Sequence, residues 1–213
     1  MKIFKPIDNE IFEAAELIRI GEVVGFPTET VYGIGANIFN YNAVDKIFQI
    51  KNRNYSKPLT AHISNIKMAE QVSSIIPDMF YELANIFLPG PLTIIVPAKD
   101  ILSPIVTANT NTIAIRFPSN IICKKFIDNV GFPIAATSAN ISGNKSAINV
   151  SEVIDELNEK IAAVIDDGNC ELKVESTVIS LVGKPKLLRE GAIPITIIEG
   201  KIGKSFYKKT ELL

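Results

Sequence analysis

Short apolar runs and amphipathic helical segments follow one another in an irregular order along this chain. Apolar or alternating runs predict strands at residues 23–26, 59–63, 92–96, 112–117, 133–136, 162–165, 175–179 and 185–189. Helical spacing of apolar residues predicts helices at residues 11–20, 40–50, 67–74, 77–87, 121–130 and 151–160, the last with Ser151 as its N-cap. A short helix is also predicted from Pro194, where a β-branched run weakens the pattern. Because strands and helices do not alternate as in a doubly wound sheet, we expect an α/β (α+β) fold with a twisted mixed sheet flanked by helices.

The composition is that of an ordinary globular protein. The chain has 213 residues, of which 47% are hydrophobic and 21% are charged, enough for one well-buried core. No repeat or linker marks a boundary, so we expect one domain, with a surface tail over residues 201–213. The net charge of -1 disfavours bulk adhesion to nucleic acid or membrane. With no signal-peptide pattern and no long apolar window, we expect a cytoplasmic protein without membrane contact.

A basic run follows the helix predicted at residues 40–50. Lys51, Arg53 and Lys57 lie among turn-forming residues, and Pro58 ends any regular element. Cations at this position suit the negative end of the helix dipole, so a solvated helix end would explain them. A bound anion would explain the same cluster, and the basic run alone does not decide between the two.

Two predicted strands direct polar side chains away from the core. Alternation in residues 59–63 places His62 on the face opposite Leu59. Alternation in residues 112–117 places Arg116 on the face opposite Ile113 and Ile115, which point into the core. An arginine so placed can bind a carboxylate with two hydrogen bonds, or it can be an ordinary surface residue. A lone histidine is also common as a satisfied structural residue.

Small polar groups gather where other predicted strands begin or end. Thr28 lies in the segment 27–35, where a proline and two glycines indicate a tight turn whose backbone can approach a ligand, although its hydroxyl groups can equally bond the loop itself. Ser138 and Asn140 follow the strand at 133–136, in a string that suits a nucleotide or a phosphate but is also plain turn chemistry. Ser176 lies at the mouth of the strand at 175–179.

Several common catalytic motifs are absent from the sequence. Gly33 and Gly35 lack the third glycine of a dinucleotide fingerprint, and the segment 200–205 is too short for a phosphate-binding P-loop. There is no H-E-x-x-H motif and no G-x-S-x-G motif. Cys123 and Cys170 lack C-x-x-C spacing and are expected to be reduced structural thiols. What remains is a set of cations and small hydrogen-bonding groups that predicts a polyanion site: Lys51, Arg53, Lys57, Arg116, Arg189, Thr28, Ser138, Asn140 and Ser176.

Eight short motifs occur in the order and spacing of one known family. They are residues 26–33, 51–53, 56–59, 89–93, 115–118, 138–140, 175–178 and 188–191. In these motifs the chain resembles the YrdC-type threonylcarbamoyl-AMP synthases (the TsaC/YrdC/Sua5 family), over roughly residues 8–200. Longer members carry a further C-terminal domain, so we expect the single-domain form. Thr137 stands where many relatives have proline, which we interpret as tolerated variation.

The resemblance implies a YrdC/RibB-like fold with a concave, positively charged cavity. It also implies a nucleotidyltransferase that joins L-threonine, bicarbonate or CO2, and ATP into threonylcarbamoyl-AMP with release of pyrophosphate, with Mg2+ accompanying ATP. The product would pass to a separate transferase complex that modifies tRNA, and a weak tRNA contact is part of this expectation.

The resemblance also assigns roles to residues. Lys51 and Arg53 would neutralise charge on the departing pyrophosphate, helped by Lys57. Arg116 would bind the threonine carboxylate, in a pocket that also contains Thr28, His62 and Ser176. The nucleotide would be held by Ser138, Asn140 and Arg189. No protein nucleophile is required, because the carbamate oxygen attacks the α-phosphorus directly.

Two other classes of function remain open. The first is a module of the same fold that binds RNA on a basic concavity without making an adenylate, which the net charge of -1 disfavours. The second is a carbamoyl-transfer accessory domain like that of hydrogenase-maturation proteins, which are fused to zinc-finger-like cysteine clusters that two isolated cysteines cannot supply.

Overall fold

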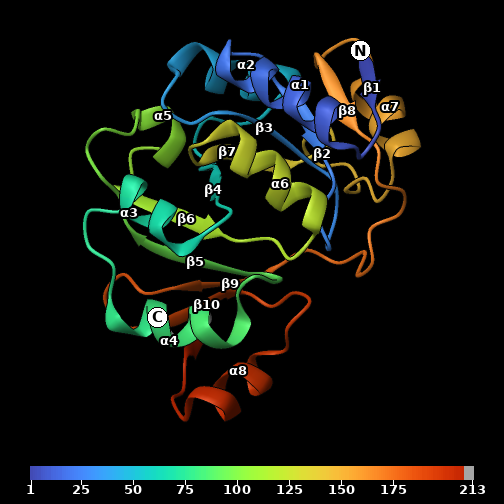
Figure 1. Ribbon diagram of the computed structural model, residues 1–213. Coiled ribbons are helices and arrows are strands. Elements are labelled where there is room, and N and C mark those ends of the chain that lie inside the picture. The colour runs from blue at the N-terminus through green and yellow to red at the C-terminus, as the bar shows by residue number, and fades with distance from the viewer. Residues whose placement is uncertain (209–213) are drawn as a thin grey trace.

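A single sheet runs through the molecule in the computed structural model, which describes residues 1–208 (Figure 1). Within these residues the sheet has eleven strands in the order β1-β8-β2-β3-β7-β4-β6-β5-β9-β10-β11. The strands are β1 (Lys2–Phe4), β2 (Val24–Phe26), β3 (Gly33–Asn37), β4 (Thr60–His62), β5 (Leu92–Pro97), β6 (Thr112–Arg116), β7 (Ile134–Ser138), β8 (Ala163–Ile165), β9 (Thr177–Ser180), β10 (Lys186–Arg189) and β11 (Tyr207–Lys208). The loops that carry the predicted polar residues connect elements of this sheet.

The sheet is mixed, as the irregular order of elements predicts. β4 pairs in parallel with β6 and antiparallel with β7, whereas β5 pairs antiparallel with β6 and in parallel with β9. The side-chain alternation expected for β4 and β6 is confirmed, because Ala61, Ile113 and Ile115 are fully buried in the core. Register pairs His62 with Arg116, which brings two residues that are far apart in sequence onto neighbouring positions.

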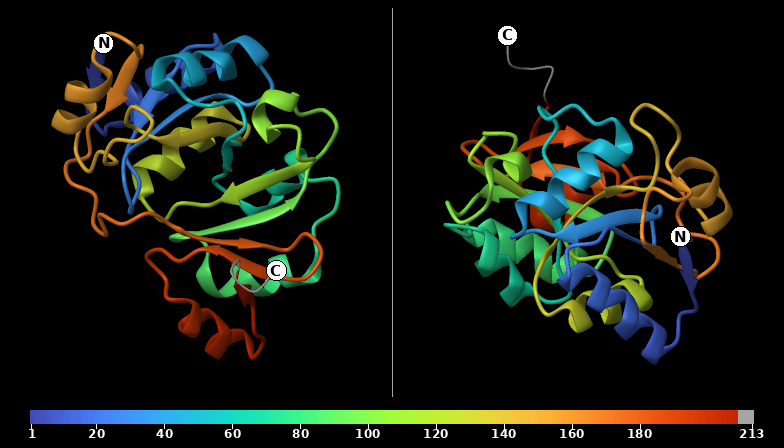
Figure 2. Two further views of the ribbon diagram at one scale, coloured as in Figure 1. Left: turned by 180° about the vertical axis from the view of Figure 1, so that it is seen from behind. Right: turned by 90° about the horizontal axis from the view of Figure 1, so that it is seen from above.

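Helices cover the sheet at both ends of the molecule. The helices are α1 (Asp8–Arg19), α2 (Tyr41–Lys51), α3 (Ala69–Val72), α4 (Asp78–Phe87), α5 (Pro104–Thr107), α6 (Ile121–Val130), α7 (Val150–Leu157) and α8 (Ile195–Ile202), with a 3-10 turn η1 (Ile66–Met68). Helices α1 and α6 pack against each other, and α4 contacts α8 beside β9 and β10 (Figures 1 and 2). The helix predicted at 121–130 has the observed bounds of α6, and no described helix is long and apolar enough to cross a membrane.

The end of α2 sets the course of the basic run. The side chain of Asn40 caps the first turn by accepting a hydrogen bond from the backbone N–H of Ala43. Lys51 is the last helical residue, and Asn52 adopts the left-handed conformation that commonly ends a helix. The chain therefore turns sharply after Lys51, and the segment 53–58 forms a loop over the neighbouring strands.

Four local predictions were wrong. Gly33 and Gly35 lie in β3 and not in a tight turn; a Cβ atom would come within 2.9 Å and 3.0 Å of the Phe26 ring, so these glycines make room for a core side chain. Helix α7 is capped by Asn149 and not by Ser151, because Asn149 accepts a hydrogen bond from the N–H of Glu152. Strand β1 and helix α5 were not predicted, since each has only three or four residues.

The fourth error concerns the tail predicted at residues 201–213. Residues 201 and 202 complete α8, and Phe206 is buried. The backbone of Tyr207 and Lys208 then pairs in parallel with β10. The start of this segment is therefore part of the folded domain, and the remainder of the predicted tail lies outside the described residues.

Candidate functional site

Two adjoining cavities open where β4, β6, β7 and β9 meet the loops that precede or follow them. The larger, of about 310 Å³, has Thr28, His62, Arg116, Ser176 and Arg189 in its lining, and we call it the deep cavity. The smaller, of about 190 Å³, is lined by Lys51, Lys57 and Asn140 among others, and we call it the loop cavity. Arg53, Ser138 and Glu175 line both cavities and form their shared wall. All ten residues proposed from sequence thus lie around one connected space.

Arg116 is buried at the base of the deep cavity. Its Nη2 donates to Glu29 Oε1 at 2.9 Å, to Thr30 Oγ1 at 2.6 Å and to Thr28 Oγ1 at 3.4 Å. Its Nε has no partner among the described residues, although the atom is buried. A buried cation paired on one edge and unpaired at Nε retains capacity for an anionic ligand, because guanidinium carries five N–H donors in a fixed fork.

The loop between β2 and β3 bonds to itself and to Arg116. Thr28 Oγ1 donates to the carbonyl of Val31 at 2.6 Å and accepts from the backbone N–H groups of Thr30 and Val31. The hydroxyl of Tyr32 points elsewhere, to the carbonyl of Gly168. The self-bonding interpretation of the two threonines is therefore correct, and Thr28 also lines the deep cavity.

His62 lies next to Arg116 and is neutral. Burial, and then the neighbouring Arg116 cation, lower the pKa of His62 to about 3. Its ring packs edge-on against Phe26 with the centroids 5.7 Å apart, and Nδ1 has no hydrogen-bond partner among the described residues. An unpaired buried nitrogen is costly, so the ring is not a satisfied structural histidine and retains one free polar position.

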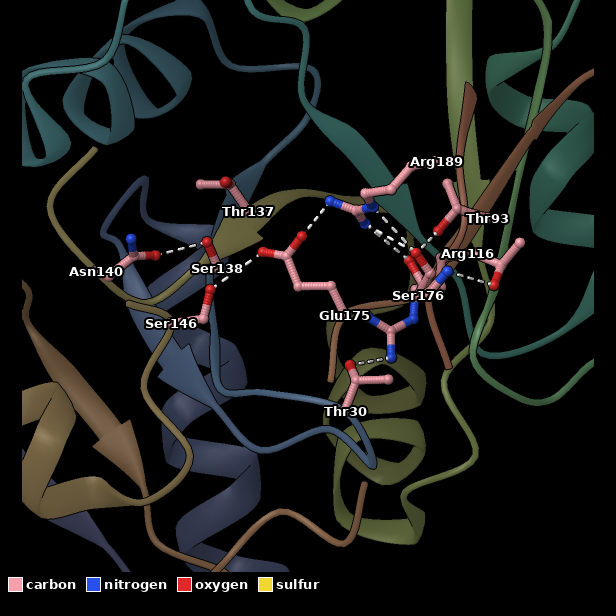
Figure 3. Close-up of polar contacts among 12 residues, drawn as sticks. Thr30, Thr93, Arg116, Thr137, Ser138, Asn140, Ser146, Glu175, Ser176 and Arg189 are labelled. Carbon is pink, nitrogen blue, oxygen red and sulfur yellow. Dashed lines mark hydrogen bonds and ion pairs between the residues drawn. The ribbon is translucent and has the colours of Figure 1, made fainter. Parts of the chain in front are cut away.

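A polar network connects β5, β9 and the end of β10 (Figure 3). The hydroxyls of Thr93 and Ser176 are 2.8 Å apart, and both side chains are buried. Arg189 donates from Nε and Nη2 to the carbonyl of Ser176 at 3.1 Å and 3.0 Å, and from Nη1 to the carboxylate of Glu175. The other carboxylate oxygen of Glu175 accepts from Ser146 at 3.1 Å. Arg189 is therefore positioned by backbone and carboxylate at the rim of the cavity.

Lys51 is not solvated, which excludes a solvent-exposed helix end for this residue. It is 1% exposed, and its ammonium donates to the carbonyls of Ser138 and Asn140 and to Asn140 Oδ1. Burial, followed by the Arg53 cation, lowers the pKa of Lys51 to about 7. All three ammonium protons are directed at the 138–140 turn, so Lys51 places Ser138 and Asn140 as well as positive charge at the loop cavity.

Arg53 and Lys57 lie on the loop itself and are more accessible. Arg53 donates to the carbonyls of Lys57 and Pro58, at 3.2 Å and 2.9 Å, and reaches Thr137 Oγ1 at 3.5 Å. Burial lowers the pKa of Arg53 below its ordinary value, and the charge of Glu175 opposes part of this shift. Lys57 is exposed. Thr137 therefore contacts a predicted site residue and lines the deep cavity. The sequence comparison with the family, in which many relatives have proline here, did not predict this contact.

Sequence reasoning missed several polar residues of this site, including four that support or adjoin the predicted ones. Glu29 and Thr30 support Arg116, Thr93 supports Ser176, and Glu175 lies in the shared wall. All four stood inside motifs that the resemblance used, so the signal was present, but no local sequence pattern assigns any of them a role. Among residues 1–208, no three His, Cys, Asp or Glu side chains could hold a metal ion together, and Cys123 and Cys170 are free and buried.

The sequence model of the Sua5_yciO_yrdC family, described as "Telomere recombination", matches residues 16–191. The chain belongs to this family. Two curated relatives are each named threonylcarbamoyl-AMP synthase: one from Bacillus subtilis is 45% identical over 92% of this chain, and one from Pyrococcus abyssi is 43% identical over 90%. The chain spans 57% and 56% of the length of these two proteins.

A solved structure of a family member has nearly the same fold. The crystal structure of P. abyssi Sua5 complexed with L-threonine superposes with a TM-score of 0.95 at 39% identity. The matched region covers 98% of this chain and 62% of the P. abyssi chain. The mixed sheet with flanking helices is therefore the fold of the Sua5_yciO_yrdC family, as the sequence motifs indicated.

Proposed function

We propose that this chain forms threonylcarbamoyl-AMP and pyrophosphate from L-threonine, bicarbonate or CO2, and ATP. The observation that carries the proposal is the junction of the two cavities: an amino-acid-sized space with a buried arginine opens directly onto a space with three further cations. The names of the two relatives and the threonine bound to the P. abyssi protein support the same reaction. The reaction class is nucleotidyl transfer.

In the deep cavity, the amino acid is held by groups that the protein has already oriented. Arg116 binds the threonine carboxylate through the edge of its guanidinium that Glu29 and Thr30 do not occupy. The hydroxyl pair of Thr93 and Ser176 is available to the threonine hydroxyl. Because His62 is neutral, its imidazole does not repel the amine and can accept or donate one hydrogen bond at the carbamate. Positioning of this kind removes much of the entropic barrier to a reaction between bound groups.

In the loop cavity, the triphosphate is bound by cations and by the 138–140 turn. Lys51 fixes that turn from beneath, and Arg53 lies in the wall shared with the deep cavity. The amine of threonine first adds CO2 to form a carbamate; a carbamate oxygen then attacks the α-phosphorus, and the bond to pyrophosphate breaks. Negative charge builds on the departing pyrophosphate, where Arg53, Lys57 and Lys51 stabilise it. ATP is expected to enter with Mg2+, which supplies further charge neutralisation on the phosphates.

The proposal extends to the partners of the reaction. The adenylate is a reactive mixed anhydride, and it would be consumed by a tRNA-modifying transferase complex for the threonylcarbamoyladenosine modification, with at most a weak tRNA contact to this chain. The work would take place in the cytoplasm, where ATP and tRNA are found.

The direct test is incubation of the purified chain with ATP, Mg2+, L-threonine and bicarbonate, followed by mass detection of the adenylate. The expected result is a product with the mass of threonylcarbamoyl-AMP that requires all three substrates. Reactions without bicarbonate and reactions with D-threonine serve as controls. Stable binding of RNA without any adenylate would instead support the RNA-binding module.

A further inference from the structure

Glu175 carries the only carboxylate that lines either cavity within residues 1–208, and it lines both of them. The other charged side chains around this space are all cationic: Lys51, Arg53, Lys57, Arg116 and Arg189. A polyanion that spans the two cavities would therefore pass five attractive groups and one repulsive one.

The carboxylate of Glu175 is held in place from two sides. Arg189 Nη1 donates to Oε2, and Ser146 Oγ donates to Oε1 at 3.1 Å, so the group lies between β10 and the loop that precedes α7 (Figure 3). Its charge is also felt across the cavity, where it raises the pKa values of both Lys51 and Arg53 against the effect of burial. Glu175 is thus a fixed negative charge at the junction.

Arg189 is the cation that pairs with this carboxylate in this structure. Once phosphate oxygens also bind Arg189, a carboxylate beside a triphosphate is unfavourable unless a further cation lies between them. Mg2+ in nucleotide sites is typically held by one or two carboxylates together with phosphate oxygens and waters. This chain offers no ready-made metal cage among its described residues, so any metal here would need nucleotide oxygens as further ligands. One carboxylate next to one hydroxyl at a phosphate-binding junction fits that incomplete coordination set.

We propose that Glu175, with Ser146 beside it, is the protein's own ligand for the divalent cation that binds with the nucleotide phosphates. The inference rests on the proposed function, because it requires a nucleotide in the loop cavity. It assigns Glu175 a task that differs from that of the surrounding cations: it makes the site selective for the metal complex of the nucleotide over the free nucleotide. A competing explanation is that Glu175 only forms an ion pair with Arg189, which breaks when a phosphate group binds Arg189 in its place.

The test is calorimetric titration with a non-hydrolysable ATP analogue, once with Mg2+ and once with EDTA. The wild-type chain is expected to bind the Mg2+ complex more tightly than the free analogue. Glu175→Gln keeps the shape of the side chain and removes its charge, and we expect the ratio of the two affinities to fall by roughly tenfold or more. Glu190→Gln is the matched control, since Glu190 is exposed and lines neither cavity, and it should keep the wild-type ratio.

A second readout follows the metal itself. In the ternary complex with Mn2+ and the analogue, water-proton relaxation reports the bound ion, and Glu175→Gln should weaken Mn2+ binding while Glu190→Gln does not. Ser146→Ala is expected to cause a smaller loss in the same direction, and it provides the measurement if Glu175→Gln is not folded by circular dichroism.

Three outcomes would overturn the inference. Tighter binding of Glu175→Gln by the same factor with Mg2+ and with EDTA would show that the carboxylate merely competes with phosphate for Arg189. Weaker binding by the same factor in both conditions would show a structural role. If the wild-type chain binds the analogue in neither condition, the proposed function fails together with this inference, whereas an unchanged ratio in Glu175→Gln overturns only the role of Glu175.

Discussion

The deep cavity and the loop cavity hold their charged groups in different ways. In the deep cavity, Arg116 and His62 are 6% and 5% exposed, and Arg116 is tied to Glu29 and Thr30. In the loop cavity, Lys57 is exposed and Arg53 is partly so, and Lys51 alone is fully buried. Buried, pre-oriented groups discriminate between similar ligands, whereas exposed cations attract any polyanion and are screened by salt. We therefore expect selectivity to come from the deep cavity and phosphate affinity from the loop cavity.

The largest effect is expected in the choice of amino acid. Valine has the shape of threonine but lacks the hydroxyl, so it would leave the buried Thr93 and Ser176 pair without its partner. Sites built to bind a hydroxyl reject such analogues by roughly 10⁴-fold or more. The measurement is ATP–pyrophosphate exchange with each amino acid, with Ser176→Ala as the variant that should lose part of the discrimination. Equal exchange with valine in the wild-type chain would contradict a hydroxyl-reading deep cavity.

The next effect concerns the stability of the deep cavity. Arg116→Met leaves the carboxylate of Glu29 buried without its cation, and removing one partner of a buried pair typically costs about 3–5 kcal/mol. The free energy of unfolding in urea measures this loss. The double variant Arg116→Met with Glu29→Gln should recover a large part of it, because no charge then remains unpaired. A double variant as unstable as the single one would show that the ion pair is not the cause.

A loss of activity without loss of fold is expected at the shared wall. Arg53→Gln removes charge that, in the proposed reaction, would stabilise the departing pyrophosphate, and by analogy with a lost oxyanion donor this should raise the barrier by about 2.7–4 kcal/mol. Steady-state kinetics should show the loss mainly in kcat, since the interaction strengthens as charge builds. A change confined to the KM for ATP would place Arg53 in ground-state binding alone.

Lys51 should make both stability and nucleotide binding depend on pH. Its pKa is lowered to about 7 in the folded chain from an ordinary 10.5, so the unfolded chain binds more protons between these values. Stability should therefore rise with pH across this window, relative to Lys51→Met, while affinity for ATP falls as the ammonium is lost. Urea unfolding and ATP titration between pH 6.5 and about 10 measure both. Lys51→Arg should bind ATP with little pH dependence, and identical slopes in all three proteins would refute the assignment.

The smallest effect is expected at the exposed edge of the loop cavity. Lys57 is exposed to solvent and ions, so Lys57→Met should weaken ATP binding by no more than about 1 kcal/mol and less at high salt. Lys67→Met, an exposed lysine outside both cavities, is the control and should have no effect. A salt-independent loss larger than this would mean that the loop cavity closes around Lys57 when nucleotide binds.

Local patterns predicted those parts of the fold that local chemistry determines. Helix α6 was predicted with its observed bounds from apolar spacing, and the structure shows Asn120 capping its start and Gly131 in the left-handed conformation at its end. Alternation predicted that His62 and Arg116 point away from the core, since side-chain direction in a strand depends only on position. The cap of α7 was misplaced because Asn149 and Ser151 are both good capping residues, and only the structure shows which one bonds to the helix.

The candidate site depended on contacts that no local pattern contains. The burial of Lys51 results from the carbonyls of Ser138 and Asn140, which are distant in sequence, so a basic run that looks solvated holds one buried cation. The same holds for Glu175, whose place in the shared wall follows from pairing of β9 with β5 and from Arg189 on β10. The family motifs predicted residues that line the two cavities, but not how those residues contact one another. The structure shows which residues line a cavity and which, such as Glu29 and Thr30, support a lining residue.

The central claim is that one connected space holds the amino acid against the triphosphate. The most direct measurement is a crystal structure of this chain with L-threonine and a non-hydrolysable ATP analogue bound together. The account predicts the threonine carboxylate on Arg116, the phosphates against the 138–140 turn, and the α-phosphorus at the wall formed by Arg53, Ser138 and Glu175. Ligands bound outside the two cavities, or an α-phosphorus too far from the threonine amine for a carbamate to reach it, would contradict the account.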